Sequence, residues 1–419
     1  MTAIEESVVA LCRTARGAAR PLATAAPAAK NAALRAAAQR LREQRGPVLE
    51  ANRGDVAAGR DAGLSGALLD RLTLTDARLE AMAAGLDEIA ALPDPVGETI
   101  ARWRRPNGLD IAQVRIPIGV VGIIYESRPN VTADAAGLCL KSGNAVILKG
   151  GSEALATNRA IADCLAAGVA TAGLPAGAVQ LIPTTDRQAV AALLRQREWV
   201  DVIVPRGGPS LIEAITTQSS IPVIQHYAGI CHVYVDDRAE LAMAERIAVN
   251  AKVQRPGVCN AMETLLVHGD VAERFLPQVA APLRAAGVEL RGCPRTRAVL
   301  PDVAIATEED WRTEYLDLIL SIRVVDGLDD AIAHINTYGT GHSDAIVTDS
   351  VTHAQRFTAA VDSAAVYVNA STRFTDGYEF GFGAEVGIST NRLHARGPMG
   401  LRELTTYKYV IQGSGQIRS

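Results

Sequence analysis

The stretch Ile116-Pro-Ile-Gly-Val-Val-Gly-Ile-Ile-Tyr-Glu-Ser-Arg-Pro-Asn-Val-Thr132 decides the expected fold. The strand pattern begins at Ile111 and runs through this stretch to Ile124, because β-branched residues dominate it. Asn144–Lys149 repeats the pattern as a buried-strand candidate, and the helical sequence Glu153–Ala172 follows it. Short strands that alternate with helices of about ten to twenty residues predict βαβ units and a mostly parallel sheet.

Helical patterns fill the first hundred residues. An apolar stripe with a spacing of three or four residues predicts a helix from about Asp76 to Leu92. Pro21 and Pro47 are expected to break the earlier helical patterns, because proline lacks the N–H that a helix interior needs.

The strand–helix alternation continues toward the C-terminus. A helix is predicted over Ser210–Thr217. The further predicted strands are Val200–Val204, Ile221–Gln225, Glu263–Val267, Leu318–Val325, Ala345–Thr348 and Ala365–Asn369. For a chain of 419 residues, two α/β domains fit better than one.

Composition excludes several function classes. The chain has 42 basic and 46 acidic side chains, so no positive excess favours nucleic-acid binding. Its longest apolar runs are far shorter than the roughly 20 residues that span a bilayer. Charges near the N-terminus do not fit a signal peptide, and six cysteines without a CxxC pair do not form a disulfide framework. Seven scattered histidines predict no metal site, and a cytoplasmic protein is expected.

One cysteine stands apart from the others. Cys259 follows Gln254-Arg-Pro-Gly-Val258, a turn whose free N–H groups and arginine would favour a thiolate. A plain structural role for it stays open. Cys293 is expected in an exposed loop. The remaining cysteines lie in apolar patterns and are expected in the core: Cys12, Cys139, Cys164 and Cys231.

Three strand-to-helix turns could form a ligand cleft. Asn130 lies at one of them, where it is either a cleft residue or an ordinary helix cap. Lys149-Gly-Gly-Ser152 and Arg206-Gly-Gly-Pro-Ser210 have the same glycine-bearing form, which suits a phosphate but also a simple turn. The chain contains no GxGxxG, GxxxxGK[ST], HExxH or GxSxG motif.

Several long segments, in order, resemble the aldehyde dehydrogenase superfamily, and within it the branch that reduces γ-glutamyl phosphate. The resemblance covers nearly the whole chain. It rests on the 116–132 stretch and on Lys141–Gly151, Val204–Gly208, Asn250–Asn260, Tyr367–Gly377 and Leu393–Leu401.

The resemblance implies an aldehyde dehydrogenase-like α/β fold with two domains, mostly parallel sheets and a small β extension for oligomerisation. Residues 1–100 and 120–226 would form the dinucleotide-binding domain, and 227–400 the catalytic domain. The extension would comprise 101–119 and 401–419, and a homodimer or homotetramer is implied.

The implied activity is NADPH-dependent reduction of L-glutamyl 5-phosphate to L-glutamate 5-semialdehyde and phosphate, a step of proline biosynthesis. Channelling of this small-molecule substrate from glutamate 5-kinase is compatible with it. Other readings remain: a coenzyme-A-acylating aldehyde dehydrogenase, which also uses a cysteine thioester, or a catalytically silent scaffold.

The resemblance also assigns roles to residues. Cys259 would form the thioester, and Asn130 with the Cys259 N–H would stabilise the oxyanion. Ser152 stands where NAD-preferring members place a glutamate on the ribose, which favours NADP, although Glu153 is its neighbour. The residues expected at the cofactor are Lys149, Gly150, Ser152, Gly207, Gly208 and Glu314.

The substrate carries carboxylates and a phosphate, so arginines should line its pocket. The candidates are Arg128, Arg255, Arg373 and Arg396, at least one of which is expected on a surface loop. Gln225-His-Tyr-Ala-Gly229 lacks the glutamate that activates water in hydrolytic members. His226 and Tyr227 depart from the small residues expected there, so they either reshape the nicotinamide pocket or give His226 a base role.

Overall fold

The computed structural model describes residues 2–225 and 228–418, which divide into two compact units. Among the described residues, unit 1 comprises 2–225, 381–387 and 399–418, and unit 2 comprises 228–380 and 388–398. The chain therefore re-enters unit 1 at Gly381–Gly387, which the ranges expected from sequence leave with the second domain. The assignment of one role to each unit stays a prediction.

Five helices precede the first strand of unit 1: α1 (Ala3–Ala23), α2 (Pro27–Glu43), α3 (Arg45–Asp61), α4 (Gly66–Leu72) and α5 (Asp76–Ala91). The predicted helix from Asp76 is confirmed, with Leu79, Met82 and Leu86 buried. Pro21 and Pro47 were expected to interrupt helices, but both lie within one, near its end or its start. Pro21 lies inside α1 two residues before its end. Pro47 lies in the first turn of α3, where an N–H has no intrahelical partner to lose.

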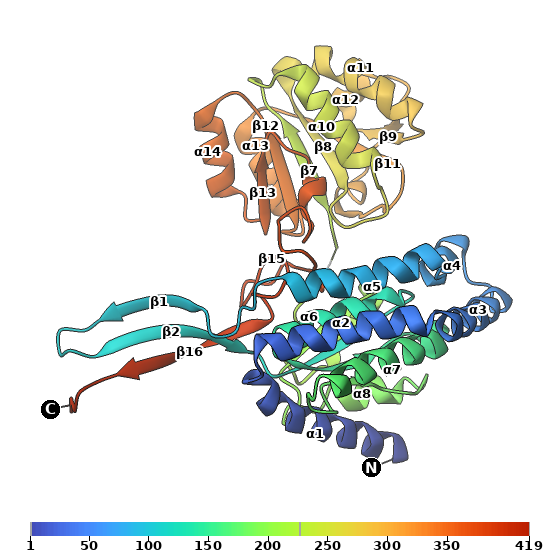
Figure 1. Ribbon diagram of the computed structural model, residues 1–419. Coiled ribbons are helices and arrows are strands. Elements are labelled where there is room, and N and C mark those ends of the chain that lie inside the picture. The colour runs from blue at the N-terminus through green and yellow to red at the C-terminus, as the bar shows by residue number, and fades with distance from the viewer. Residues whose placement is uncertain (1, 226–227, 419) are drawn as a thin grey trace. The chain divides into compact units, whose positions relative to one another are not determined.

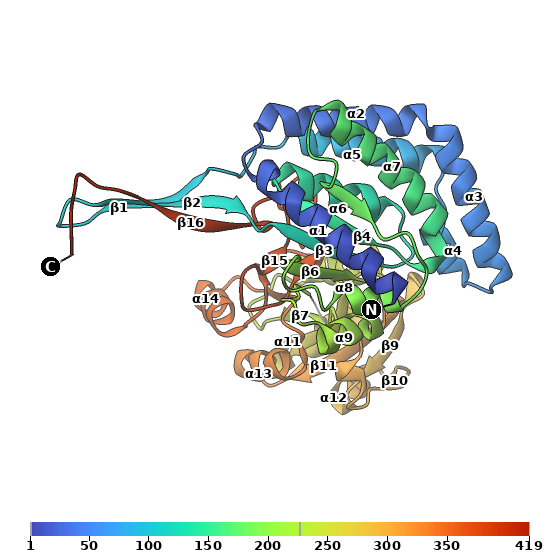
Figure 2. The ribbon, with the colours of Figure 1, turned by 90° about the horizontal axis from the view of Figure 1, so that it is seen from below.

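A four-stranded parallel sheet forms the centre of unit 1. Its strands are β3 (Val120–Tyr125), β4 (Ala145–Lys149), β5 (Val179–Leu181) and β6 (Val202–Arg206), in the order β5-β4-β3-β6. The connecting helices are α6 (Asn130–Lys141), α7 (Leu155–Thr171) and α8 (Gln188–Leu193), with the 3₁₀ turn η1 (Ser152–Ala154) before α7 and α9 (Pro209–Gln218) after β6. Helices α2 and α5 pack over α6 and α7 (Figures 1 and 2).

The strand order indicates at which edge of this sheet a ligand site is expected. The chain leaves β3 for β4 on one side and later returns to β6 on the other, so the strand order reverses between β3 and β6. In open parallel sheets this reversal is where ligands bind. The expected strand Ile221–Gln225 was wrong, since only an isolated bridge joins Val223 to Ile203. Pro222 in this short segment has no N–H to extend the ladder.

Unit 2 contains a seven-stranded parallel sheet in the order β10-β9-β11-β8-β7-β12-β13. Its strands are β7 (Cys231–Val235), β8 (Met262–His268), β9 (Glu289–Gly292), β10 (Ala304–Ile305), β11 (Ile319–Val325), β12 (Ser343–Val347) and β13 (Ala365–Val368). Its helices are α10 (Leu241–Val253), α11 (Gly269–Ala285), α12 (Pro294–Val299), α13 (Leu328–Tyr338) and α14 (Val351–Ala360), with the turns η2 (Asp310–Arg312) and η3 (Thr372–Phe374). The short pair β14 (Ile388–Ser389) and β15 (Gly397–Pro398) completes it.

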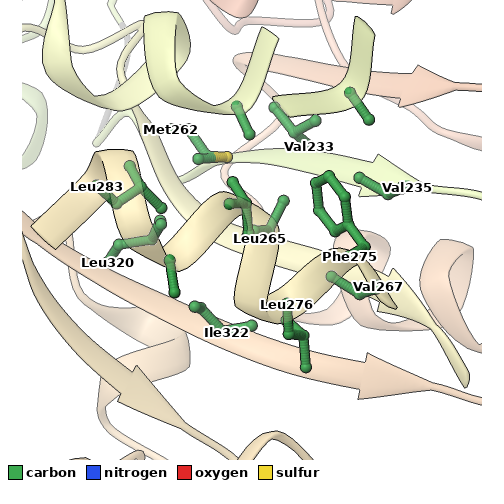
Figure 3. Close-up of a cluster of buried hydrophobic side chains, with 14 of the residues drawn as sticks. Val233, Val235, Met262, Leu265, Val267, Phe275, Leu276, Leu283, Leu320 and Ile322 are labelled. Atoms are coloured by element: carbon green, nitrogen blue, oxygen red, sulfur yellow. The ribbon is translucent and has the colours of Figure 1, made fainter. Parts of the chain in front are cut away.

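Apolar burial holds this second sheet against its helices. Phe275 and Leu276 of α11 lie over Leu265 and Val267 of β8 (Figure 3), and all four side chains are fully buried. Burying one such side chain contributes about 1.5–3 kcal/mol. Apart from Ile221–Gln225, every predicted strand is confirmed to within two residues at each end. The helix predicted over Ser210–Thr217 is confirmed with the same accuracy. The α/β fold with mostly parallel sheets is also confirmed.

A three-stranded antiparallel arm extends from unit 1. It consists of β1 (Thr99–Arg104), β2 (Asp110–Pro117) and β16 (Thr405–Gln412), with β2 in the middle. Figures 1 and 2 show these strands projecting away from the helices of their unit. Within the described ranges, no helix combines the length and the apolarity that a membrane span needs.

Candidate active site

Asn130 is the first residue of α6, at the carboxyl edge of the unit 1 sheet. The N-cap position belongs to Pro129, and no side chain caps the helix there. The Asn130 amide instead donates to Oδ2 of Asp134, one turn later, at 2.9 Å. Burial raises the pKa of Asp134 to about 6, and the hydrogen bond from Asn130 opposes this shift. The cap alternative for Asn130 is therefore wrong, and its exposed amide is oriented by a carboxylate.

The turn after β4 carries the predicted cofactor lysine. Lys149 is buried, and its Nζ donates to the Gly150 carbonyl at 2.7 Å. Burial lowers the pKa of Lys149, while the charge of Glu153 acts in the opposite direction. Ser152 follows in an exposed position and begins η1. A hydroxyl and a buried lysine therefore border this loop, with no carboxylate at position 152.

The turn after β6 is held by an acidic side chain from the β3 loop. Glu126 Oε2 accepts the Gly208 N–H at 3.0 Å, and a Cβ at Gly207 would overlap the same carboxylate. The Glu126 N–H donates to the carbonyl of Arg206 at 3.0 Å, which continues the β3–β6 pairing into the loop. Hydrogen bonds therefore join the loops after β3 and β6, at the point in the sheet where the strand order reverses.

Cys259 lies in unit 2, in the turn between α10 and β8, at the amino edge of the second sheet. Its side chain is partly buried. Gly229 lies against it so closely that a Cβ there would overlap the Cys259 carbonyl. The buried thiol of Cys231 donates to that same carbonyl at 3.2 Å. Gly229, just before β7, and Cys231, the first residue of β7, therefore hold the backbone of the cysteine turn in place.

Glu314 connects the loop before β11 to this turn. Its Oε1 accepts the Gly229 N–H at 2.9 Å. Burial raises the pKa of Glu314, and that hydrogen bond opposes the shift. The predicted ribose-binding glutamate and the predicted nucleophile are thus both joined to Gly229.

Two arginines lie at the cysteine turn. Burial lowers the pKa of Arg373, the positive charge of Arg255 lowers it further, and Cys259 raises it. Arg373 donates through Nε to Gln254 at 2.9 Å. The Asn260 amide donates to the Thr375 carbonyl at 2.9 Å, which joins η3 and its neighbours to the turn. The charges of Arg373 and Cys259 therefore act on each other, which suits a thiolate or an anionic substrate.

Comparison with known proteins assigns this chain to a family. Residues 1–291 and 298–410 match the model of the aldehyde dehydrogenase family. A gamma-glutamyl phosphate reductase of Moorella thermoacetica is 62% identical over 404 residues, which are 96% of this chain and 97% of that protein. The chain belongs to the aldehyde dehydrogenase family. Within that family it groups with the gamma-glutamyl phosphate reductases, since the enzyme of that name from Syntrophomonas wolfei is 56% identical over 99% of both proteins.

A solved structure agrees with this placement. The crystal structure of gamma-glutamyl phosphate reductase from Thermotoga maritima matches with a TM-score of 0.97 at 49% identity, covering 98% of this chain and 100% of the other. This aldehyde dehydrogenase therefore has the fold of that reductase over almost its full length.

The other two predicted substrate arginines of this aldehyde dehydrogenase belong to other segments of the chain. The guanidinium of Arg396 donates to the side chain and to the carbonyl of Asp362, each at 3.0 Å. Arg128 lies in unit 1, two residues before Asn130. Of the four candidates, Arg373 is the one whose pKa responds to the charges of both Arg255 and Cys259.

The cysteine predictions are mostly confirmed. The four expected core cysteines are buried. Cys293 was placed wrongly in an exposed loop: it is partly buried at the start of α12, packs against the unit 2 core and accepts the Val324 N–H at 3.4 Å. His226 and Tyr227, which the sequence singled out, lie outside the described residues.

Sequence reasoning missed residues that support the candidate side chains within each unit. In unit 1 these are Glu126 and Asp134, and in unit 2 they are Gly229 and the buried ion pair of Lys252 and Glu263. One signal was available for Glu126, which directly precedes the Ser-Arg-Pro-Asn130 segment. The others carry no motif, because their partners lie in other elements or one helical turn away.

Proposed function

We propose that this protein reduces L-glutamyl 5-phosphate to L-glutamate 5-semialdehyde and phosphate, as a gamma-glutamyl phosphate reductase. The observation that carries the proposal is the 62% identity to an enzyme of that name over almost the whole of both chains. The arginine-lined cysteine turn supports it, because the substrate is anionic.

Cys259 acts as the nucleophile in this proposal. Its thiolate attacks the acyl carbon, the acyl–oxygen bond breaks, and phosphate leaves with the electron pair. A nicotinamide cofactor, when bound, supplies the hydride that reduces the resulting thioester. The tetrahedral alkoxide left on Cys259 then collapses: the oxygen electron pair re-forms the carbonyl, the carbon–sulfur bond breaks, and the aldehyde departs as Cys259 regains its thiolate. Arg255 and Arg373 favour the thiolate form at the start and at the end.

Asn130 is the proposed side-chain donor to the oxyanion of each tetrahedral state. Negative charge develops on the former carbonyl oxygen twice, and one such donor is worth about 3 kcal/mol. The hydrogen bond to Asp134 supports this role, because it holds the nitrogen end of the amide in a fixed direction.

NADPH is the proposed cofactor. Lys149, Gly150, Ser152, Gly207 and Gly208 suit its adenosine and phosphate groups, and Glu314 suits the nicotinamide ribose. Because Ser152 carries no charge, a 2′-phosphate meets no repulsion at that position.

The remaining proposals concern context. A homodimer or homotetramer formed through the arm, a cytoplasmic location and transfer of substrate from glutamate 5-kinase all fit a biosynthetic reductase of this family. A coenzyme-A-acylating activity is the alternative, and its fold would be the same.

A steady-state assay in the direction of semialdehyde oxidation tests the proposal. With glutamate 5-semialdehyde and NADP, turnover should depend on added phosphate, exceed turnover with NAD, and fall to background in Cys259→Ala. Mass spectrometry of enzyme quenched during turnover should find the glutamyl adduct on Cys259. Turnover that requires coenzyme A and ignores phosphate would reject the proposal.

A further inference from the structure

Ser127 has a backbone conformation that L-residues rarely adopt. Its φ is 44°, in the left-handed region, and the residue is not glycine. Such a conformation is unfavourable and persists only where its surroundings enforce it. Ser127 is also buried, so solvent does not provide its hydrogen-bond partners.

Glu153 enforces this turn. Its Oε1 accepts the Ser127 backbone N–H at 2.6 Å and the Ser127 hydroxyl at 2.8 Å. Glu153 belongs to η1, in the loop after β4, so the two hydrogen bonds join that loop to the one after β3. The carboxylate crosses directly over Gly151, where a Cβ would overlap it. The glycine is therefore needed so that Glu153 can reach Ser127.

The chain between Ser127 and Asn130 has little freedom. Pro129 fixes its own φ and keeps Arg128 out of the helical region, so the direction in which the chain leaves Ser127 sets where α6 begins. The Val131 N–H already bonds to the Arg128 carbonyl at 3.0 Å, which makes this segment the first turn of the helix. A change at Ser127 therefore moves the Asn130 amide.

We propose that Glu153 is a positioning residue that fixes the Ser127 turn and, through it, aims the Asn130 amide, which couples the loop after β4 to the oxyanion donor. The inference rests on the proposed function, because it assumes the role of Asn130 given above. It also assigns the Glu153 carboxylate to Ser127 rather than to the cofactor ribose, although Glu153 adjoins the position that reads the ribose in NAD-preferring relatives.

A double-mutant cycle tests the coupling. The kcat of semialdehyde oxidation is measured for the wild type, Glu153→Ala, Asn130→Ala and the double variant. We expect Asn130→Ala to lose about 100- to 1,000-fold and Glu153→Ala about 10- to 100-fold. In the Asn130→Ala background, Glu153→Ala should cost less than about threefold, because the group that it positions is gone. A role in general folding would instead give additive losses, and additive losses would overturn the proposal.

Cofactor kinetics separate positioning from ribose recognition. In Glu153→Ala, the KM for NADP and the preference for NADP over NAD should each stay within about threefold of the wild type. A tenfold change in that preference would assign Glu153 to the ribose and overturn the proposal. Glu153→Gln retains an acceptor for Ser127 and should recover part of the lost kcat, and it replaces the alanine variant if that variant does not fold.

Glu43→Gln is the matched control, because Glu43 is an exposed carboxylate whose hydrogen bonds stay within α2. It should match the wild type throughout. A fully active Glu153→Ala beside an inactive Asn130→Ala would overturn this inference alone. A fully active Asn130→Ala would overturn the proposed oxyanion role and the inference with it.

Discussion

At the scale of single residues, Asp134 orients the Asn130 amide but lowers the stability of the folded protein. A carboxylate accepts hydrogen bonds only, so it must face the nitrogen of the Asn130 amide, whereas a neutral amide could face either end. The cost is burial of a charge, which raises the pKa of Asp134 to about 6. A folded-state pKa above the unfolded one means that the folded state binds the proton more tightly. Ionised Asp134 therefore destabilises the fold above pH 6, and the penalty disappears once both states are protonated, below about pH 4.

Asp134→Asn should separate the two effects. At pH 8 we expect the free energy of unfolding to rise by about 1–2 kcal/mol, and at pH 4 we expect no gain. At pH 8 the kcat should fall several-fold, because the amide of Asn130 loses its fixed direction. Thermal denaturation at the two pH values and steady-state kinetics check this. An equal stability gain at both pH values would show that Asp134 is not the titrating group.

Sequence alone could suggest Cys259 and Asn130 but not Asp134. The cysteine follows a glycine-bearing turn with an arginine, and the asparagine follows a strand, so both have local signals. The partner of Asn130 is an aspartate one helical turn later, a spacing that is ordinary on any helix. Nor does the sequence show that Ser127 has a positive φ, because serine favours that conformation no more than other residues do.

At the scale of elements, a buried ion pair closes the loop that carries Cys259. Lys252 in α10 and Glu263 in β8 are both fully buried, and their side chains are 2.5 Å apart. Burial raises the pKa of Glu263 to about 7 and lowers that of Lys252, and each charge opposes the shift of the other. The Leu316 N–H also donates to Glu263, at 3.3 Å, so the pair reaches the segment after Glu314.

Glu263→Ala should be strongly destabilising, because it leaves a buried ammonium without its partner. We expect a loss of about 3–5 kcal/mol in the free energy of unfolding, measured by denaturant titration. Replacing both residues by apolar ones, in Lys252→Met with Glu263→Leu, should recover most of it. Arg45→Ala is the control: it removes a pair whose side chains are 54% and 59% exposed, and it should cost less than about 1 kcal/mol. If Glu263→Ala and Arg45→Ala lost similar amounts of stability, burial would not set the strength of the Lys252–Glu263 pair.

Element positions were largely predictable, and the exceptions have physical causes. Strands of the parallel sheets are continuous apolar runs, which sequence shows directly. Ile221–Gln225 has the composition of a strand, but proline in so short a segment limits it to one bridge. The return of Gly381–Gly387 to unit 1 depends on contacts with distant residues, which no local pattern contains.

At the scale of the whole molecule, the arm exposes a row of apolar side chains that its own unit does not cover. Tyr407, Tyr409 and Ile411 alternate along one face of β16 and are 49–58% exposed. Trp103 of β1 packs edge-on against Tyr409, with the ring centroids 6.1 Å apart. Contiguous exposed apolar surface of this kind marks an interaction site, and the family resemblance makes a second copy of the chain its proposed partner.

Tyr409→Glu combined with Ile411→Glu should therefore dissociate the oligomer. Each substitution places a charge within the apolar row, where an interface would bury it without a partner. Size-exclusion chromatography with light scattering should show a multimer for the wild type and a monomer for the double variant. Lys408→Glu is the control, because this residue directly precedes Tyr409 but points to the opposite face, and it should leave the mass unchanged. A wild type that stays monomeric at micromolar concentrations, or a double variant that stays multimeric, would contradict an interface at this face of the arm.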